Sequence, residues 1–160
     1  MHYRGLLYRA LNPIWAREPL SGEGARRHGG RFNRRGATAL YLSFSIPTAI
    51  REANQVGTLQ PTTLVACEAD IGPILDASDP AALAPYGLTP ADLAADDWRI
   101  RMRDEGTAPT QLFADRLIAE GFAGMRVPSY ARGAGEGDLN AVLWRWDGML
   151  RVVDDEGRLR

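Results

Sequence analysis

The sequence is short of three things, and each shortage excludes a class of protein. It has a single cysteine, Cys67, which rules out an internal disulfide and a multi-cysteine metal site. Its 19 basic and 20 acidic residues give a net charge of −1, whereas nucleic-acid binders usually carry a positive excess. No segment approaches the roughly 18 apolar residues needed to cross a bilayer. We therefore expect a cytoplasmic chain with no membrane partner and no direct nucleic-acid partner.

What is present suits a folded enzyme-sized chain. The 160 residues, 45% of them hydrophobic, are enough for one domain over 1–160 with a core of its own. Strand-like runs stand at both ends of the sequence and helical patterns in the middle, which predicts a mixed α+β fold and not a regular βαβ series. The predicted strands cover residues 5–12, 38–45 and 62–71, a strand end from 124 and two strands within 139–153; the predicted helices cover 47–56, 89–102 and 108–122.

Local signals support several of these elements. Ser45 is a candidate cap and Pro47 lies in the first turn of the helix 47–56, which places Ala49, Ala53 and Val56 on one face. Thr89, Pro90 and Asp92 form a helix start of the same kind. In the helix 108–122 we expect Leu112, Phe113, Ala114 and Leu117 to face the core and Gly121 to end the helix. Asp147-Gly148 predicts a hairpin between the last two strands.

Residues 13–38 lack sustained periodicity and are predicted to form a long loop, a feature that is often functional. Between Ser21 and Gly36 there are five glycines, including Gly30, and six basic side chains: Arg26, Arg27, His28, Arg31, Arg34 and Arg35. Glycines let a ligand approach the backbone, and guanidinium groups bind phosphate oxygens. The composition therefore suits a pyrophosphate or phosphosugar, although a solvated loop has the same composition. Neither a P-loop nor a Rossmann glycine motif is present.

Two further residues have both an ordinary and a functional interpretation. Tyr41 can be a core aromatic or a flat platform for a planar ring such as nicotinamide. Glu52 can be an exposed helix charge or a carboxylate that stabilises positive charge developing on a sugar carbon. Other chemistry is disfavoured: His2 and His28 lack metal-ligand spacing, so no metal is expected, and Ser129 lacks the context of a hydrolase nucleophile. A glycosidase-like carboxylate pair stays open.

Taken together, these residues resemble a known family. The stretch "LSGEGARRHGGRFNRRGATALYLSFSIPTAIREA" is similar to the first half of the RES domain, which is found in bacterial toxins paired with an Xre-like antitoxin. The family is named for an Arg, a Glu and a Ser, which match Arg31 in "GGRFN", Glu52 in "AIREA" and Ser129 in "RVPSYARG". "LNAVLW", with Asn140, resembles the closing motif of the family. The likeness extends along nearly the whole chain.

The resemblance implies a fold like that of diphtheria-type ADP-ribosyltransferases, with a central split β-sheet and flanking helices, and an activity on NAD without a metal. Arg31 would hold a phosphate or ribose of NAD, and Tyr41 would stack against nicotinamide. Glu52 would stabilise the oxocarbenium as nicotinamide leaves. Gly30, Ser129 and Asn140 would shape the substrate pocket. The implied partners are NAD, an Xre-like antitoxin and a protein that accepts ADP-ribose.

Several alternatives accompany this interpretation. Water or phosphate as acceptor would make the chain an NAD glycohydrolase or phosphorylase; an open basic loop and a long glycine-rich loop between Ser129 and Asn140 favour a protein acceptor. A non-catalytic phosphate-binding module would use the arginines of residues 26–35 without chemistry. A pure antitoxin-binding partner would have an inactive site. Phe32 departs from the family pattern, in which many members have Trp.

Overall fold

The computed structural model describes residues 1–55 and 57–159. Within them the strands are β1 (Tyr3–Leu11), β2 (Leu40–Ser43), β3 (Thr63–Ile71), β4 (Ile74–Asp76), β5 (Gly124–Pro128), β6 (Leu139–Leu143) and β7 (Leu150–Val152). The α-helices are α1 (Glu23–His28), α2 (Ile46–Ala53), α3 (Pro80–Leu83), α4 (Pro90–Ala94), α5 (Trp98–Glu105) and α6 (Pro109–Ala119), with 3-10 turns η1 (Pro13–Trp15) and η2 (Ala84–Tyr86). This is the mixed α+β fold that the sequence predicts.

The strands form one seven-stranded sheet in the order β4-β5-β6-β2-β1-β3-β7. β4 and β5 are parallel, and the other neighbours are antiparallel. The sheet has two parts, β4-β5-β6-β2 and β1-β3-β7, which meet within the described residues at the register pair Tyr8–Ser43. This narrow junction, which we call the seam, is the structural counterpart of the expected split sheet.

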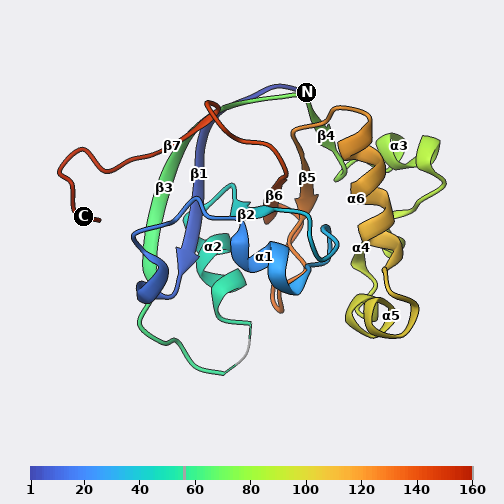
Figure 1. Cartoon of the computed structure of the whole chain (residues 1–160), viewed down its shortest axis with the longest axis horizontal. Helices are drawn as coiled ribbons and strands as arrows, with labels where there is room; N and C mark the ends of the chain where they lie inside the picture. The colour runs from blue at the N-terminus through green and yellow to red at the C-terminus, as the bar shows by residue number, and fades with distance from the viewer. Residues whose placement is uncertain (56, 160) are drawn as a thin grey trace.

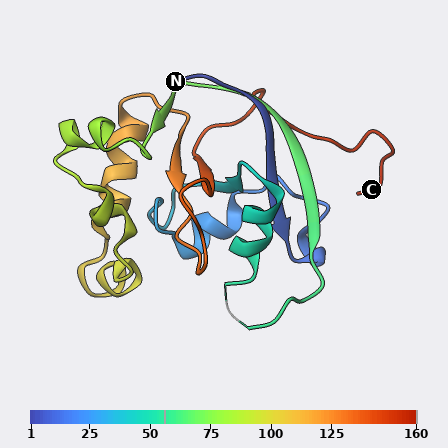
Figure 2. The same cartoon turned by 180° about the vertical axis from the view of Figure 1, so that it is seen from behind.

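The helices are unevenly distributed over the sheet. In Figure 1, α3, α4, α5 and α6 gather beside β4 and β5, whereas α1 and α2 lie near the middle of the molecule. The view from behind in Figure 2 shows the long β1 and β3 running together on the other side, away from the α3–α6 group.

The sheet separates two apolar clusters, because alternate residues of a strand face opposite sides. On β2 and β6, Leu40, Leu42 and Ala141 belong to the cluster around β1 and β3. Tyr41 and Val142 belong to the cluster around α4 and α6. Cys67 is fully buried in the first cluster, as expected for an ordinary core thiol. The second cluster lies on the face of the sheet that carries the candidate site.

Helix ends follow the sequence signals closely. The Ser45 hydroxyl accepts a hydrogen bond from the Thr48 N–H at 3.3 Å and caps α2. Thr89 and Asp92 form a reciprocal capping box at the start of α4. Gly121 ends the α6 segment with φ +92°, a backbone conformation that glycine adopts without steric cost.

Some of the residues expected in the core are buried, and others are not. Ala49 is buried, whereas Ala53 is exposed, and Val56 lies outside the described residues. On α6, Phe113, Ala114 and Leu117 are buried as predicted, but Leu112 is 54% exposed. Leu112 is exposed because, at 3.6 residues per turn, it lies on the side of α6 opposite the buried residues Phe113, Ala114 and Leu117.

Three element predictions are wrong, each for a physical reason. Residues 13–38 are not one loop, because η1 and α1 form within them. The predicted helix 89–102 divides into α4 and α5: Ala95 is extended, with ψ 126°, and Asp96-Asp97 follows, a residue type that favours caps over helix interiors. β6 and β7 do not form a hairpin, because β5 and β2 already occupy both edges of β6. Gly148 still turns the chain, and β7 pairs with β3 instead.

Candidate functional site

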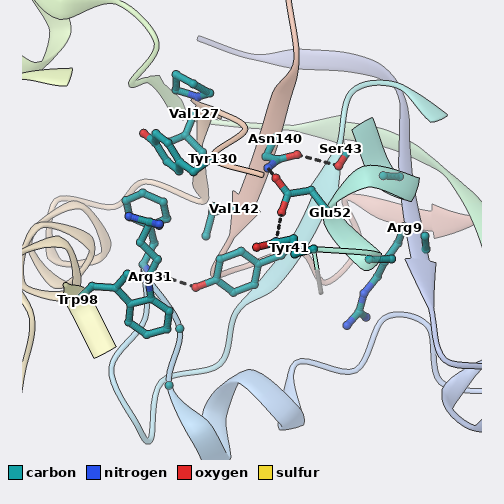
Figure 3. A pocket seen from close by; sticks show the side chains of 18 of the residues that line it. Arg9, Arg31, Tyr41, Ser43, Glu52, Trp98, Val127, Tyr130, Asn140 and Val142 are labelled. Atoms are coloured by element: carbon teal, nitrogen blue, oxygen red, sulfur yellow. Dashed lines mark hydrogen bonds between the residues drawn. The ribbon is translucent and has the colours of Figure 1, made fainter. Parts of the chain in front are cut away.

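A cavity of about 420 Å³ lies beside the seam, on the face of the sheet that carries Tyr41 and Val142. Its size is within the range of small-molecule sites. The lining comes from both parts of the sheet, from the loop before β2, from α2, from the start of α5 and from the segment after β5: it includes Arg9, Gly30, Arg31, Tyr41, Ser43, Glu52, Trp98, Arg99, Val127, Tyr130, Asn140 and Val142. Figure 3 shows most of these side chains converging on one space.

Sheet register explains why these residues meet. Tyr41 and Ser43 are two apart on β2 and therefore face the same side. Their partners on β6 are Val142 and Asn140, respectively. Asn140 in turn pairs with Val127 of β5, two residues before Ser129. Strand alternation thus places three separate stretches of sequence on one face of the sheet.

Glu52 lies over this face, on the last turn of α2, and other side chains hold its carboxylate. Oε1 accepts hydrogen bonds from the Ser129 hydroxyl at 2.5 Å and from the Asn140 amide at 2.6 Å. Oε2 accepts one from the Gln55 amide at 2.8 Å. The Ser43 hydroxyl donates to Asn140 Oδ1 at 2.7 Å, which leaves the Asn140 amide hydrogens directed at Glu52. We call Glu52, Ser129, Asn140 and Ser43 the carboxylate cluster.

The glycine-rich loop after Tyr130 is tied to α2 on the other side of this cluster. Asp138 accepts hydrogen bonds from the Thr48 hydroxyl at 2.7 Å and from Arg51 at 2.9 Å. It also accepts one from the Gly135 N–H at 2.7 Å. These bonds lower the pKa of Asp138 below its usual value, with the Gly135 bond as the largest cause. Both ends of the segment that carries Ser129 and Asn140 are therefore fixed relative to the helix that carries Glu52.

Tyr41 lines the cavity with its ring, while its hydroxyl is engaged elsewhere. The hydroxyl donates to Asn33 Oδ1 at 2.6 Å and accepts from the Phe32 N–H at 3.1 Å. Burial raises the pKa of Tyr41, and the Phe32 bond offsets part of this effect, so the phenol stays neutral near pH 7. A neutral ring held by its polar end is suited to stacking and not to proton transfer.

Residues 30–35, which we call the arginine loop, are held mainly through their backbone. The fully buried Gln111 donates from its amide to the carbonyls of Gly30 at 2.9 Å and Asn33 at 3.1 Å. The Trp144 indole donates to the Phe32 carbonyl at 2.9 Å. Gly30 approaches Tyr41 so closely that an added Cβ would lie 2.5 Å from the tyrosine oxygen. The loop is thus an ordered wall of the cavity.

Arg31 is directed away from Glu52, toward α4. Its Nη1 donates to the carbonyls of Leu93 at 3.0 Å and Ala95 at 2.7 Å. Its guanidinium also lies 4.7 Å from the ring centroid of Tyr130. Burial raises the pKa of Tyr130 to about 12, and the Arg31 charge opposes part of that shift. Arg31 therefore contacts both the end of α4 and the segment that follows β5.

The other basic side chains of this region are also engaged by protein groups, and they point in different directions. Arg26 and Arg27 bind Glu23, and the Arg26 bond is the main reason that the pKa of Glu23 falls to about 2. Arg34 donates to Asp115 at 2.6 Å, and Arg35 donates to the His28 carbonyl at 3.4 Å. These arginines do not converge into one cradle for a phosphate.

All six residues expected from the sequence reach the neighbourhood of the cavity. Glu52, Asn140 and Ser129 are in direct contact. Tyr41 and Gly30 line the same space, as does Arg31. Sequence reasoning missed the supporting residues Ser43, Asn33, Gln111, Tyr130, Trp98 and Arg9. Of these, Ser43 had a usable signal: it is two residues after Tyr41 in a strand and so had to share its face.

The described part of the chain contains no cluster of three His, Cys, Asp or Glu side chains able to hold a metal ion. Nor does it contain a helix with the length and hydrophobicity to cross a membrane.

Comparison with known proteins identifies the family of the chain. No curated protein sequence matches it. In structure it is similar to a chain in the crystal structure of the M. tuberculosis MbcT–MbcA toxin–antitoxin complex, with a TM-score of 0.73 and 25% sequence identity over 96% of this chain and 84% of that chain. A family model of the RES domain matches residues 6–160. Because that match spans nearly the whole sequence, the chain belongs to the RES domain family.

Proposed function

We propose that this chain is a toxin of a toxin–antitoxin pair, and that it cleaves the bond between nicotinamide and ribose in NAD and transfers ADP-ribose to an acceptor. The observation that carries the proposal is the carboxylate cluster. Glu52 is fixed by Ser129 and Asn140 in a cavity that also presents the Tyr41 ring. A fixed carboxylate next to an aromatic surface complements a planar leaving group on a sugar carbon that becomes positive.

The chemistry follows from these groups. The electron pair of the C1′–N bond leaves with nicotinamide, whose ring nitrogen is already cationic and needs no proton. The ribose carbon becomes oxocarbenium-like, and the Glu52 carboxylate stabilises this charge. An acceptor oxygen then bonds to C1′, and a hydroxyl acceptor releases its proton to solvent. Tyr41 contributes a stacking surface, since its hydroxyl is committed to Asn33 and Phe32.

Two observations favour a small acceptor, water or phosphate, over a protein side chain. The arginine loop is bound by Gln111 and Trp144, and Asp138 ties down the glycine-rich loop. Both loops are therefore held in place and are less able to adapt to a protein acceptor, although Arg34 and Arg35 stay exposed. The second candidate function is therefore that of an NAD glycohydrolase or phosphorylase, which would deplete NAD in the cell.

The non-catalytic phosphate-binding module has less support. Such a module needs several cations that converge on one ligand, whereas Arg26, Arg27 and Arg34 each bind a carboxylate of the chain.

A partner follows from the same family. The structural relative is a toxin bound to its antitoxin, and we extend this to an Xre-like antitoxin for the present chain. Covering the cavity would block access to Glu52. The complex should then consume NAD more slowly than the isolated chain, and equal rates would contradict this part of the proposal.

The test is a time course of nicotinamide release from NAD labelled in its adenylate half. The wild type should release nicotinamide, and Glu52→Gln should be slower by roughly 10²–10³-fold, the usual cost of losing electrostatic stabilisation of a transition state. Glu105→Gln, a change to a glutamate at the exposed end of α5, is the matched control and should behave as wild type.

The label identifies the acceptor. Label in small molecules, with or without added phosphate, would identify a phosphorylase or a glycohydrolase. Label on a protein band from lysate would identify a protein transferase. If wild type and Glu52→Gln both release no nicotinamide with any acceptor, the enzymatic proposal is wrong.

A further inference from the structure

Arg31 is the family residue whose surroundings differ most from a substrate-binding role. Its side chain is 15% exposed, and two backbone carbonyls at the end of α4 accept hydrogen bonds from it. The last carbonyls of a helix have no partner within the helix, and a cation there is favourable. Asp96 is 94% exposed and 3.4 Å away, so it contributes little. The carbonyls of Leu93 and Ala95 are the main partners.

The second contact of Arg31 leads to the carboxylate cluster. Its guanidinium stacks on the ring of Tyr130, which follows Ser129, the residue that donates to Glu52. The Tyr130 ring also packs near Phe32, with centroids 6.3 Å apart. Arg31 thus joins the arginine loop, the end of α4 and the segment after β5.

The α4 end matters because it leads directly into the cavity wall. Residues 95–97 connect α4 to α5, and α5 begins with Trp98 and Arg99, both of which line the cavity. Trp98 is 8% exposed, so its position depends on where the start of α5 is held. Figure 3 shows Trp98 beside Arg31, across the cavity from Glu52.

We propose that Arg31 is a positioning residue, which sets the distance between the Trp98–Arg99 wall and the carboxylate cluster by bridging the α4 carbonyls and Tyr130, and which does not itself hold the phosphate or ribose of the substrate. The inference rests on the proposed function for its kinetic consequence. Its structural consequence can be measured without any reaction.

The experiment compares Arg31→Lys and Arg31→Ala with wild type in two measurements: amide hydrogen exchange over residues 93–103, and KM and kcat for nicotinamide release. A lysine ammonium lacks the planar guanidinium, so it cannot stack on the Tyr130 ring while also donating to both carbonyls, as Arg31 does through Nη1. Both variants should exchange at least about tenfold faster in this segment. KM should rise at least about tenfold, and kcat should change less than about threefold, because the partners of Glu52 remain.

A second variant and a matched control separate positioning from substrate contact. Tyr130→Leu keeps the Arg31 charge but removes its ring partner. It should raise both KM and the rate of amide hydrogen exchange over residues 93–103. Arg116→Lys is the control: Arg116 also stacks on a tyrosine, Tyr86, at 4.6 Å, and its partner is the exposed carboxylate of Glu120, just after α6. It should match wild type.

The outcomes are distinct. A higher KM with unchanged exchange would mean that Arg31 binds the substrate directly, and faster exchange with unchanged kinetics would mean that the wall is not functional; either result overturns the inference. If the wild type releases no nicotinamide, the proposed function fails, and unchanged exchange in Arg31→Ala would separately overturn the positioning role.

Discussion

The carboxylate cluster and the arginine loop border the same cavity, but different kinds of bonds hold them. In the cluster, side chains bind side chains, as Asn140 and Ser129 do with Glu52. In the loop, the side chains of Gln111 and Trp144 bind backbone carbonyls. A hydrogen bond between two side chains can be lost without moving the backbone. A hydrogen bond to a backbone carbonyl helps to fix the path of the chain itself. Changes in the cluster should therefore affect the reaction, whereas changes that displace the backbone of the loop should affect mainly the stability of the fold.

The largest effect on stability should come from Gly30→Ala, which tests the loop. The new Cβ would lie 2.5 Å from the Tyr41 oxygen and 2.6 Å from Asn33 Oδ1. Relieving this overlap must displace the Tyr41–Asn33 bond, at a cost of about 1–3 kcal/mol in the free energy of unfolding. Urea unfolding would measure it. Gly24→Ala is the matched control, because a Cβ there meets nothing within 4 Å, and it should not destabilise the protein.

An intermediate effect, on activity, should come from Ser43→Ala in the cluster. Ser43 is 3% exposed, and its hydroxyl orients the Asn140 amide toward Glu52. A neutral hydrogen bond contributes about 0.5–1.5 kcal/mol, so kcat should fall by up to about tenfold. Ser43→Thr keeps the hydroxyl and should retain most of the activity. If Ser43→Ala unfolded the protein without a specific loss of kcat, the contrast between the two regions would be wrong.

The smallest effect should come from Asp138→Asn, at the border of the cluster. The pKa of Asp138 in the folded chain lies below its ordinary value of 3.8, chiefly because of the Gly135 N–H. A lowered pKa stabilises the fold above the unfolded value, and this stabilisation is lost as the pH falls through the folded value. Wild type should therefore lose stability more steeply than Asp138→Asn below pH 3.8. Parallel pH profiles of the two proteins would mean that the loop is held by other contacts.

Features that depend on residues close together in the sequence could be predicted from it. Helix caps such as Ser45 and the Thr89–Asp92 box depend on residues a few positions apart, and they were predicted correctly. Members of the site that carry their own chemistry, such as Glu52, could be identified from residue type and family resemblance. Their meeting on one face of the sheet follows from strand alternation once the strand order is known.

What the sequence could not predict depends on distant partners. The Asp147-Gly148 turn forms, but β7 pairs with β3 because β6 has no unoccupied edge. Arg31 contacts residues more than sixty positions away, so no local pattern could predict that it binds the end of α4.

The seam has a mechanical consequence. β1 and β2 share the single register pair Tyr8–Ser43, so we expect the sheet to deform most easily there. The cavity spans that line, because Arg9 belongs to one part of the sheet and Tyr41 and Asn140 belong to the other. A molecule bound in the cavity would contact both parts of the sheet and so hold them together. Ligand binding in the cavity should therefore make the two parts of the sheet unfold together, as one cooperative unit.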